Sequence, residues 1–267
     1  MEHTQIITPA DLAKYAGTRD SEAVIPELVW MLVRQSTSDL ITCRIPYGDA
    51  INQPGLDGLV ETESGFRQFI PKKRSLWEIG TGGEPQTKAT EDFKKRTGQL
   101  TLPERQGASY IFVTPHAANS GGWSEPAQRK WIENRKNDGW KNIKIIDGIT
   151  LTDWLREFPA IGKWLLKKIG PMKANTGLST PAEHWENMQE FARPDNMSLS
   201  PKIFLIGREH ACAEMHRLFH GEINKLVFAY ESPADTEDFV AAFLASLDTE
   251  TQRSFCNRCL FIKDPDV

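Results

Sequence analysis

The stretch from Pro54 to Arg96 decides the fold, and it reads PGLDGLVETESGFRQFIPKKRSLWEIGTGGEPQTKATEDFKKR. Asp57 lies in PGLDG, where an irregular loop meets the short apolar pair Leu59-Val60. Glu78 lies in SLWEIG, an apolar run that ends at a glycine-rich turn. A basic helix follows, from Pro85 to the end of the stretch. The order is therefore strand, acid, turn, strand, acid and basic helix.

Acids on two neighbouring strands can share a divalent cation, because hard cations such as Mg²⁺ take carboxylate oxygens as ligands. A bound metal can activate water and neutralise charge on a phosphoryl group. The layout therefore indicates a metal-dependent nuclease. Spacing alone leaves the alternative open that Asp57 and Glu78 are solvated acids at strand ends.

Three motifs in this stretch, GLDG, SLWEIGTGG and KATEDFKKR, resemble the core of the PD-(D/E)xK restriction-endonuclease-like superfamily. More narrowly, they resemble the N-terminal nuclease-like domain of some bacterial antiviral STAND NTPases, over about Ala23 to Gly170. The resemblance puts the family's first acid on Asp57 and its second on Glu78. The family's lysine usually stands two residues later, where this chain has Gly80. Either Lys88 supplies the amine from the next helix or the site is weakened; we favour the migrated lysine.

The resemblance implies a DNA endonuclease that depends on Mg²⁺ (or Mn²⁺), acting as the effector domain of a bacterial anti-phage defence protein. It implies homo-oligomerisation on activation by a phage-derived trigger. Asp57 and Glu78 would hold the metal, with Glu27 as a further acid from the first helix, although a solvated first-turn acid is the competing interpretation of Glu27. A basic group, Lys94, Lys95 and Arg96, would contact the DNA backbone without reading sequence. The alternative is a catalytically inactive nuclease-fold module that binds DNA or a protein partner.

Composition limits the class of protein. The chain of 267 residues is long enough for two domains. No apolar run approaches the roughly 18 residues that span a membrane, and the N-terminus lacks the features of a secretion signal. Four cysteines without such a signal indicate reduced thiols, so we expect a cytoplasmic protein with no membrane partner. The net charge is −4, yet residues 67–96 hold eight Lys and Arg against four Asp and Glu, which suffices for a local phosphate-binding face.

Periodicity predicts an α/β fold for residues 1–170, a restriction-endonuclease-like mixed sheet flanked by helices. A first helix over Ala23–Gln35 carries an apolar stripe, with Pro26 in its first turn. A capping-box pattern at Thr150–Asp153 opens the last helical region. The remaining elements are expected as strands at Leu40–Ile45, Leu59-Val60, Leu76–Ile79, Ser109–Val113 and Asn142–Ile146, and as helices at Pro85–Arg96 and Ser124–Lys136.

Residues 171–200 are polar, and we expect a linker there, with a short helix around His184 to Phe191. Residues 201–267 resemble the start of a STAND/P-loop NTPase-like domain, an incomplete α/β segment, in which Lys225–Leu247 reads as strand, turn and helix. A phosphate-binding loop needs G-x-x-x-x-G-K-[ST]. Glu231–Thr236 reads ESPADT instead, so the Walker A motif is degenerate and we expect no orthodox nucleotide binding. The short length predicts a fragment of a longer sensor.

A zinc site is a weaker alternative in the same region. Cys212, His216 and His220 share a helix face, and Cys256 and Cys259 form a CxxC pair. The CxxC adjoins the apolar run LFI, and buried free cysteine is common. We therefore do not expect zinc.

Overall fold

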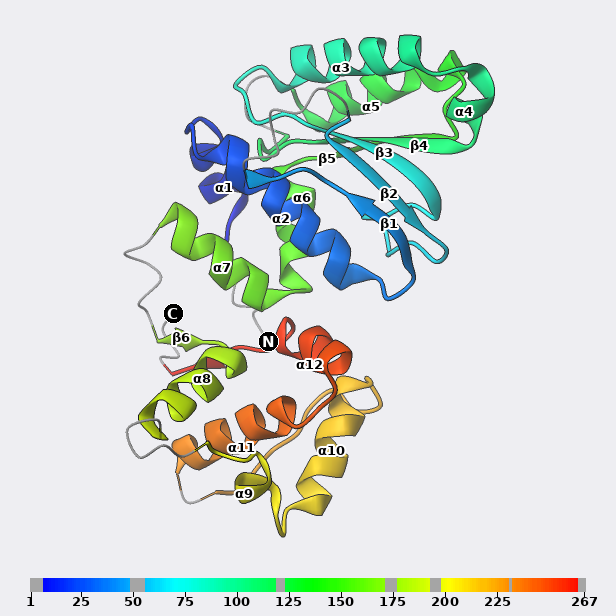
Figure 1. Cartoon of the computed structure of the whole chain (residues 1–267). Coiled ribbons are helices and arrows are strands. Elements are labelled where there is room, and N and C mark those ends of the chain that lie inside the picture. The colour runs from blue at the N-terminus through cyan, green and yellow to red at the C-terminus, as the bar shows by residue number, and fades with distance from the viewer. Residues whose placement is uncertain are drawn as a thin grey trace. The chain divides into compact units, whose positions relative to one another are not determined.

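A computed structural model describes residues 7–48, 56–118, 123–170, 177–192, 198–230 and 232–263. The chain divides into two compact units, Met1–Pro171 and Met172–Val267. Figure 1 colours the first from blue to green and the second from yellow-green to red. Each unit has its own hydrophobic core. No helix among the described residues is both long and apolar enough to cross a membrane.

The first unit is built on a five-stranded sheet in the order β1-β2-β3-β4-β5. The first three strands pair antiparallel, and the last two continue parallel to β3. The mixed sheet and the α/β class predicted from periodicity are therefore confirmed. The strands are β1 (Leu40–Arg44), β2 (Gly58–Thr62), β3 (Lys73–Ile79), β4 (Ala108–Val113) and β5 (Asn142–Ile146).

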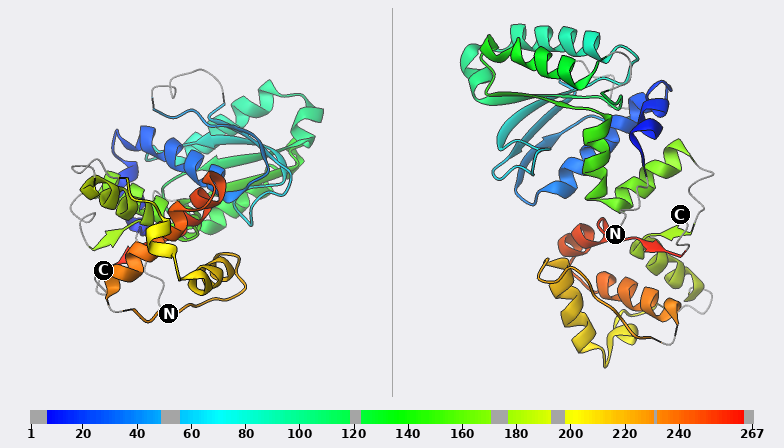
Figure 2. Two further views of the ribbon diagram at one scale, coloured as in Figure 1. Left: turned by 60° about the horizontal axis from the view of Figure 1, so that its bottom comes forward. Right: turned by 180° about the vertical axis from the view of Figure 1, so that it is seen from behind.

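Helices cover both faces of this sheet, as Figure 1 and the rear view in Figure 2 show. One face packs against α1 (Pro9–Ala16), α2 (Ser21–Ser36), α6 (Gly148–Arg156) and α7 (Pro159–Ile169). The other face packs against α3 (Pro85–Gln99) and α5 (Glu125–Glu133), with the short helix α4 (Leu102–Gln106) and the 3₁₀ turn η2 (Lys136–Asp138) at their ends.

Alternation along β3 fixes which face each side chain takes. Trp77 belongs to the core under α2, whereas Leu76 belongs to the core under α3. Glu78 is two residues after Leu76, so it also points towards α3. Gly80 continues the same face, since a β-carbon there would meet the side chains of Phe112 and Lys88. Positions 78 and 80, where the resemblance would place an acid and a lysine, therefore share the face covered by α3.

Two local expectations were wrong, and one helix was not expected. Because α2 begins at Ser21, Pro26 lies inside the helix rather than in its first turn, and it has no N–H to donate to the carbonyl of Glu22. The N-cap of α6 is Asp147, which accepts a hydrogen bond from the backbone N–H of Thr150, so the helix starts before the predicted capping box. The helix α4 was not predicted.

The second unit is mainly helical. It contains α8 (Pro181–Ala192), α9 (Lys202–Leu205), α10 (Glu209–Phe219), α11 (Pro233–Ala245) and α12 (Thr249–Cys256), with an antiparallel pair of short strands, β6 (Leu178–Ser179) and β7 (Phe261–Ile262). The expected helices around His184 and after Arg208 are present as α8 and α10. However, α8 packs on α11, so much of the segment expected to be a linker is an integral part of this unit.

The strand expected before α11 does not form. Residues 225–230 have no strand hydrogen bonding within the described chain. Leu226, Phe228 and Tyr230 still alternate onto the core of the unit, so their two-residue period reflects extended chain packed on helices rather than a sheet. The strand–loop–helix arrangement of a phosphate-binding loop is thus not present in the described residues.

Candidate active site

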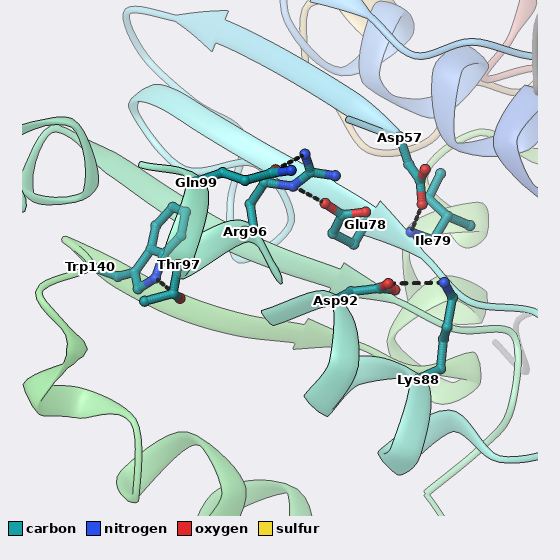
Figure 3. A network of polar contacts seen from close by, with 9 residues as sticks. All are labelled: Asp57, Glu78, Ile79, Lys88, Asp92, Arg96, Thr97, Gln99 and Trp140. Atoms are coloured by element: carbon teal, nitrogen blue, oxygen red, sulfur yellow. Dashed lines mark hydrogen bonds and ion pairs between the residues drawn. The ribbon is translucent and has the colours of Figure 1, made fainter. Parts of the chain in front are cut away.

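Asp57 is anchored at the open end of β3. It directly precedes β2, whose Gly58 lies opposite Trp77 of β3. The backbone N–H of Ile79 donates a hydrogen bond of 2.9 Å to Asp57 Oδ2 (Figure 3). No hydrogen bond within the described chain reaches the other oxygen, Oδ1. One carboxylate oxygen therefore fixes the side chain, and the other is available to a ligand.

Glu78 is buried next to Arg96, a residue of α3. Its side chain is only 3 % exposed, and Arg96 Nε donates to Glu78 Oε1 at 2.5 Å. Burial raises the pKa of Glu78 to about 8, against the opposing effect of the Arg96 hydrogen bond. The negative charges of Asp57 and Asp92 add to the increase. These two acids are therefore close enough to Glu78 for their charges to interact with it.

Lys88 lies over Gly80, on the face of β3 that carries Glu78. A β-carbon built on Gly80 would be 3.1 Å from Lys88 Cγ and 2.8 Å from Phe112 Cζ. Partial burial lowers the pKa of Lys88, but the hydrogen bond and charge of Asp92, followed by the charges of Asp57 and Glu78, outweigh it and raise the pKa. Asp57, Glu78 and Lys88, which are far apart in the sequence, are thus brought into one charged cluster.

Asp92 is a member of this cluster that the sequence analysis missed. Lys88 Nζ donates a hydrogen bond of 2.9 Å to Asp92 Oδ1 (Figure 3). The second oxygen, Oδ2, is buried and has no hydrogen-bond partner among the described residues. Burial raises the pKa of Asp92. The signal was present in the sequence, since Lys88, Asp92 and Arg96 follow at intervals of four and share one face of a helix.

A cavity of about 560 Å³ opens beside the cluster. Its charged lining consists of four acids, Glu22, Asp57, Glu84 and Glu91, and one base, Lys88. The glycine-rich turn from Gly80 to Gly83 and Pro26 of α2 complete much of its wall. The cavity is therefore strongly acidic, and its shape is set by the end of β3, the start of α3 and one face of α2.

Glu27, the predicted acid from the first helix, does not line this cavity within the described chain. Glu22 takes that place instead, together with Pro26. Residues four apart share a helix face, whereas residues five apart, such as Glu22 and Glu27, point about 140° away from each other. Glu22 lies before the predicted helix start at Ala23 and was therefore not considered, and the role of Glu27 as a metal ligand stays a prediction.

The donor atoms at this site suit a hard cation. All of the candidates are carboxylate oxygens, including the open Oδ1 of Asp57 and the orphaned Oδ2 of Asp92. In the described residues, no group of three or more His, Cys, Asp or Glu side chains is close enough together to hold a metal ion. A shared metal site would therefore require these side chains to move towards one another.

The three predicted DNA-binding residues are separated by the structure. Lys94 and Lys95 are exposed on α3, where they can reach a ligand. Arg96 is buried and paired with Glu78, and it also donates to Gln99 Oε1 at 2.8 Å. Its role is internal, so only the two lysines remain candidates for contact with DNA.

The cysteines of the second unit are half-buried free thiols. All four cysteines of the chain are free. Burial raises the pKa of both Cys256 and Cys259 to about 11, so both remain protonated at neutral pH. Reaction as a nucleophile or as a metal ligand would require loss of that proton.

No family model matches this chain, and neither does any curated protein or solved structure. A function must therefore be inferred from the sequence motifs and from the geometry described above.

Proposed function

We propose that the first unit is a DNA endonuclease that depends on Mg²⁺ or Mn²⁺ and hydrolyses phosphodiester bonds. The observation that carries this proposal is the position of Lys88. Its stem fills the space over Gly80, at the position where the PD-(D/E)xK pattern would place a lysine two residues after Glu78. An ammonium group held beside Asp57 and Glu78 is the arrangement that the migrated-lysine hypothesis requires.

The charge of the cavity supports a dependence on cations. Four acids against one lysine would repel a phosphodiester, because like charges interact strongly in a partly desolvated site. Glu22, Asp57 and Asp92 would hold the metal, which would supply a Lewis acid and a more acidic bound water when present. Lys88 would place a positive charge against the phosphate, and Asp92 would orient that charge through their hydrogen bond. The ion pair with Arg96 holds the carboxylate of Glu78 at the edge of the proposed metal site.

The alternative function is a catalytically inactive nuclease-fold module that binds DNA or a protein partner. The Glu78–Arg96 ion pair favours it, because a carboxylate already hydrogen-bonded by a buried guanidinium is a poorer metal ligand. Under this alternative the exposed Lys94 and Lys95 would still contact phosphate. Binding without metal-dependent cleavage distinguishes the two functions.

Cleavage of supercoiled plasmid DNA by the full chain tests the proposal. We expect nicking that requires Mg²⁺ or Mn²⁺, and a loss of about 100-fold or more in Asp57→Asn and Lys88→Met. Lys14→Met removes an exposed lysine from α1, on the other face of the sheet, and should cleave normally. Protein concentration should be varied over a wide range, because the resemblance implies activation by oligomerisation. Folded protein that cuts at no concentration, with or without metal, would contradict the proposal.

The biological setting rests on the resemblance alone. As an effector in bacterial anti-phage defence, the nuclease would be held inactive until a phage-derived trigger brings copies together. A chain that cleaves only at high concentration, or only when artificially dimerised, is the behaviour expected of such an effector.

A further inference from the structure

A second cavity, of about 680 Å³, lies on another flank of α3 from the acidic one. Its volume falls in the range of ligand pockets in proteins. The nuclease reaction proposed above does not use it. The cavity is enclosed by α3, α4, η2 and the end of α5, and its lining residues include Lys94, Thr97, Arg105, Arg135 and Asp138.

The charge of this cavity is opposite to that of the first. Three bases, Lys94, Arg105 and Arg135, face one acid, Asp138. Among the described residues, none of these three bases forms an ion pair with a carboxylate. Nearby bases do: Arg129 of α5 pairs with Glu125, and Lys136 of η2 pairs with Glu133. These two neighbouring bases are thus neutralised by acids, whereas within the described ranges the three bases of the cavity are not.

Arg105 is held in place by backbone carbonyls. Its Nη1 donates to the carbonyl of Thr97 at 2.6 Å, while its Nε is buried and has no hydrogen-bond partner in the described part of the chain. Gly139, with φ of 83°, lies against this side chain, since a β-carbon there would be 3.7 Å from Arg105 Nε. Carbonyls orient a guanidinium without neutralising its charge, so Arg105 still needs an anion.

Arg135 is oriented in the same manner. Its guanidinium lies 3.9 Å from the centre of the Trp131 ring, and its Nη1 donates to the carbonyl of Trp131 at 2.9 Å. Burial lowers the pKa of Arg135, and the nearby charge of Asp138 offsets this only in part. Two guanidinium groups are therefore fixed in advance, which reduces the entropy lost when a ligand binds.

A hydroxyl group adds a further donor. Thr97 Oγ1 accepts a hydrogen bond of 3.0 Å from Trp140 Nε1, as Figure 3 shows. This leaves the hydroxyl proton of Thr97 available to a ligand, since the side chain donates to no acceptor in the described residues. Asn134 also lines the cavity and carries an amide donor.

We propose that this cavity binds phosphate groups. Planar guanidinium groups match the geometry of phosphate oxygens and bind them through paired hydrogen bonds, and a lysine at the rim adds charge. The phosphate could come from a DNA backbone that also reaches the acidic cavity, which rests on the proposed function, or from a free phosphorylated small molecule. In the first case the cavity positions DNA on α3, and Lys94 rather than Lys95 or Arg96 makes the contact.

Binding of a fluorescent DNA duplex, measured by anisotropy, tests whether the cavity binds the phosphates of a DNA backbone. EDTA removes divalent metal, so no cleavage interferes. Lys94→Glu should weaken binding by about tenfold, and it should lower the slope of log Kd against log salt by about one. Arg135→Lys keeps the positive charge but removes the paired N–H donors of the guanidinium, so it should also weaken binding. Lys14→Glu is the matched control, because it makes the same change at an exposed position of α1, on the other face of the sheet.

Titration with inorganic pyrophosphate tests whether the cavity binds a free phosphorylated small molecule. Binding is followed as an increase in the Tm of the protein. A stabilisation of the wild type that Lys94→Glu and Arg135→Lys abolish would support a small phosphorylated ligand even if DNA binding were unaffected. The proposal is overturned if the cavity variants change neither measurement. It is also overturned if Lys14→Glu weakens DNA binding as much as Lys94→Glu does and the cavity variants leave the pyrophosphate shift unchanged. Because no metal is present, these results are independent of whether the protein cleaves DNA. Lys94 is exposed, so its variant should fold normally.

Discussion

Lys88 and Gly80 fit together: a β-carbon on Gly80 would lie 3.1 Å from Lys88 Cγ. A side chain at position 80 would also lie 2.8 Å from Phe112 Cζ. The space that a lysine two residues after Glu78 would need is therefore already filled, partly by another lysine. Glycine at position 80 therefore leaves room for Lys88 of α3, whereas a lysine at position 80 would collide with the side chain of Lys88.

Gly80→Ala should destabilise the protein, because the added methyl group must displace Phe112 or the stem of Lys88. Overpacking of this kind costs about 1–3 kcal/mol in the free energy of unfolding. Urea unfolding measures the loss. Gly82→Ala is the matched control, since a β-carbon at Gly82 meets nothing within 4 Å, and its effect should stay within about 0.5 kcal/mol. Equal effects in the two variants would show that the space over Gly80 is not tightly filled.

Glu22→Gln should reduce cleavage, whereas Glu27→Gln should not. Only Glu22 lines the acidic cavity, and it shares the helix face of Pro26. Loss of one carboxylate at a metal site of this kind costs on the order of 10- to 100-fold in activity or metal affinity. The two variants make the same chemical change on one helix, so a plasmid nicking assay over a range of Mg²⁺ concentrations compares them directly. A larger effect at Glu27 would restore the assignment made from the sequence.

The sequence was sufficient to predict most of the first unit, because its signals are local. Strand alternation, apolar runs and glycine-rich turns gave all five strands and the main helices. The acids Asp57 and Glu78 were singled out by their places on neighbouring strands and by the resemblance; the structure brings them near each other, and their catalytic role stays a prediction. Glu22 was not considered because it lies before the predicted helix start at Ala23; it is five residues from Glu27, about 140° around the helix, and it lines the acidic cavity.

Two features could not be read from the sequence. The pairing of Glu78 with Arg96 depends on how α3 lies across β3, which is a tertiary contact between distant residues. The extended segment around Phe228 shows a strand-like period, but a strand also needs a partner, and periodicity carries no information about partners. Asp92 was missed because an acid within a basic helix resembles a solvated residue until its burial is known.

Asp92→Asn should impair cleavage by changing Lys88 rather than by unfolding the protein. The hydrogen bond and the negative charge of Asp92 raise the pKa of Lys88, so their loss should lower that pKa. The alkaline limb of the pH–rate profile should therefore move to lower pH, which a purely structural defect would not cause. Asp153→Asn, at an exposed acid paired with Arg156, is the control and should leave the profile in place. An unchanged alkaline limb in Asp92→Asn would separate Asp92 from the function of Lys88.

Replacing Glu78 by Gln should change how stability depends on pH. Burial raises the pKa of Glu78 from 4.5 to about 8 in the folded chain. Between these values the folded state binds more protons than the unfolded state, so the free energy of unfolding falls as pH rises. The contribution is complete below the unfolded pKa and is lost as pH rises through the folded one. The wild type should therefore lose stability relative to Glu78→Gln from about pH 5 to about pH 8.

Urea unfolding of both proteins in EDTA, at several pH values across this window, measures the difference. Asp92, whose pKa is also raised by burial, is present in both proteins, so its effect largely cancels. A difference that stays constant with pH would mean that Glu78 is ionised throughout and that the Arg96 hydrogen bond outweighs burial. The ion pair would then be permanent, and Glu78 would be a structural residue that orients α3 on β3. A difference that varies with pH as expected would instead show that Glu78 loses its proton near neutral pH. Its carboxylate could then bind another partner in place of that proton.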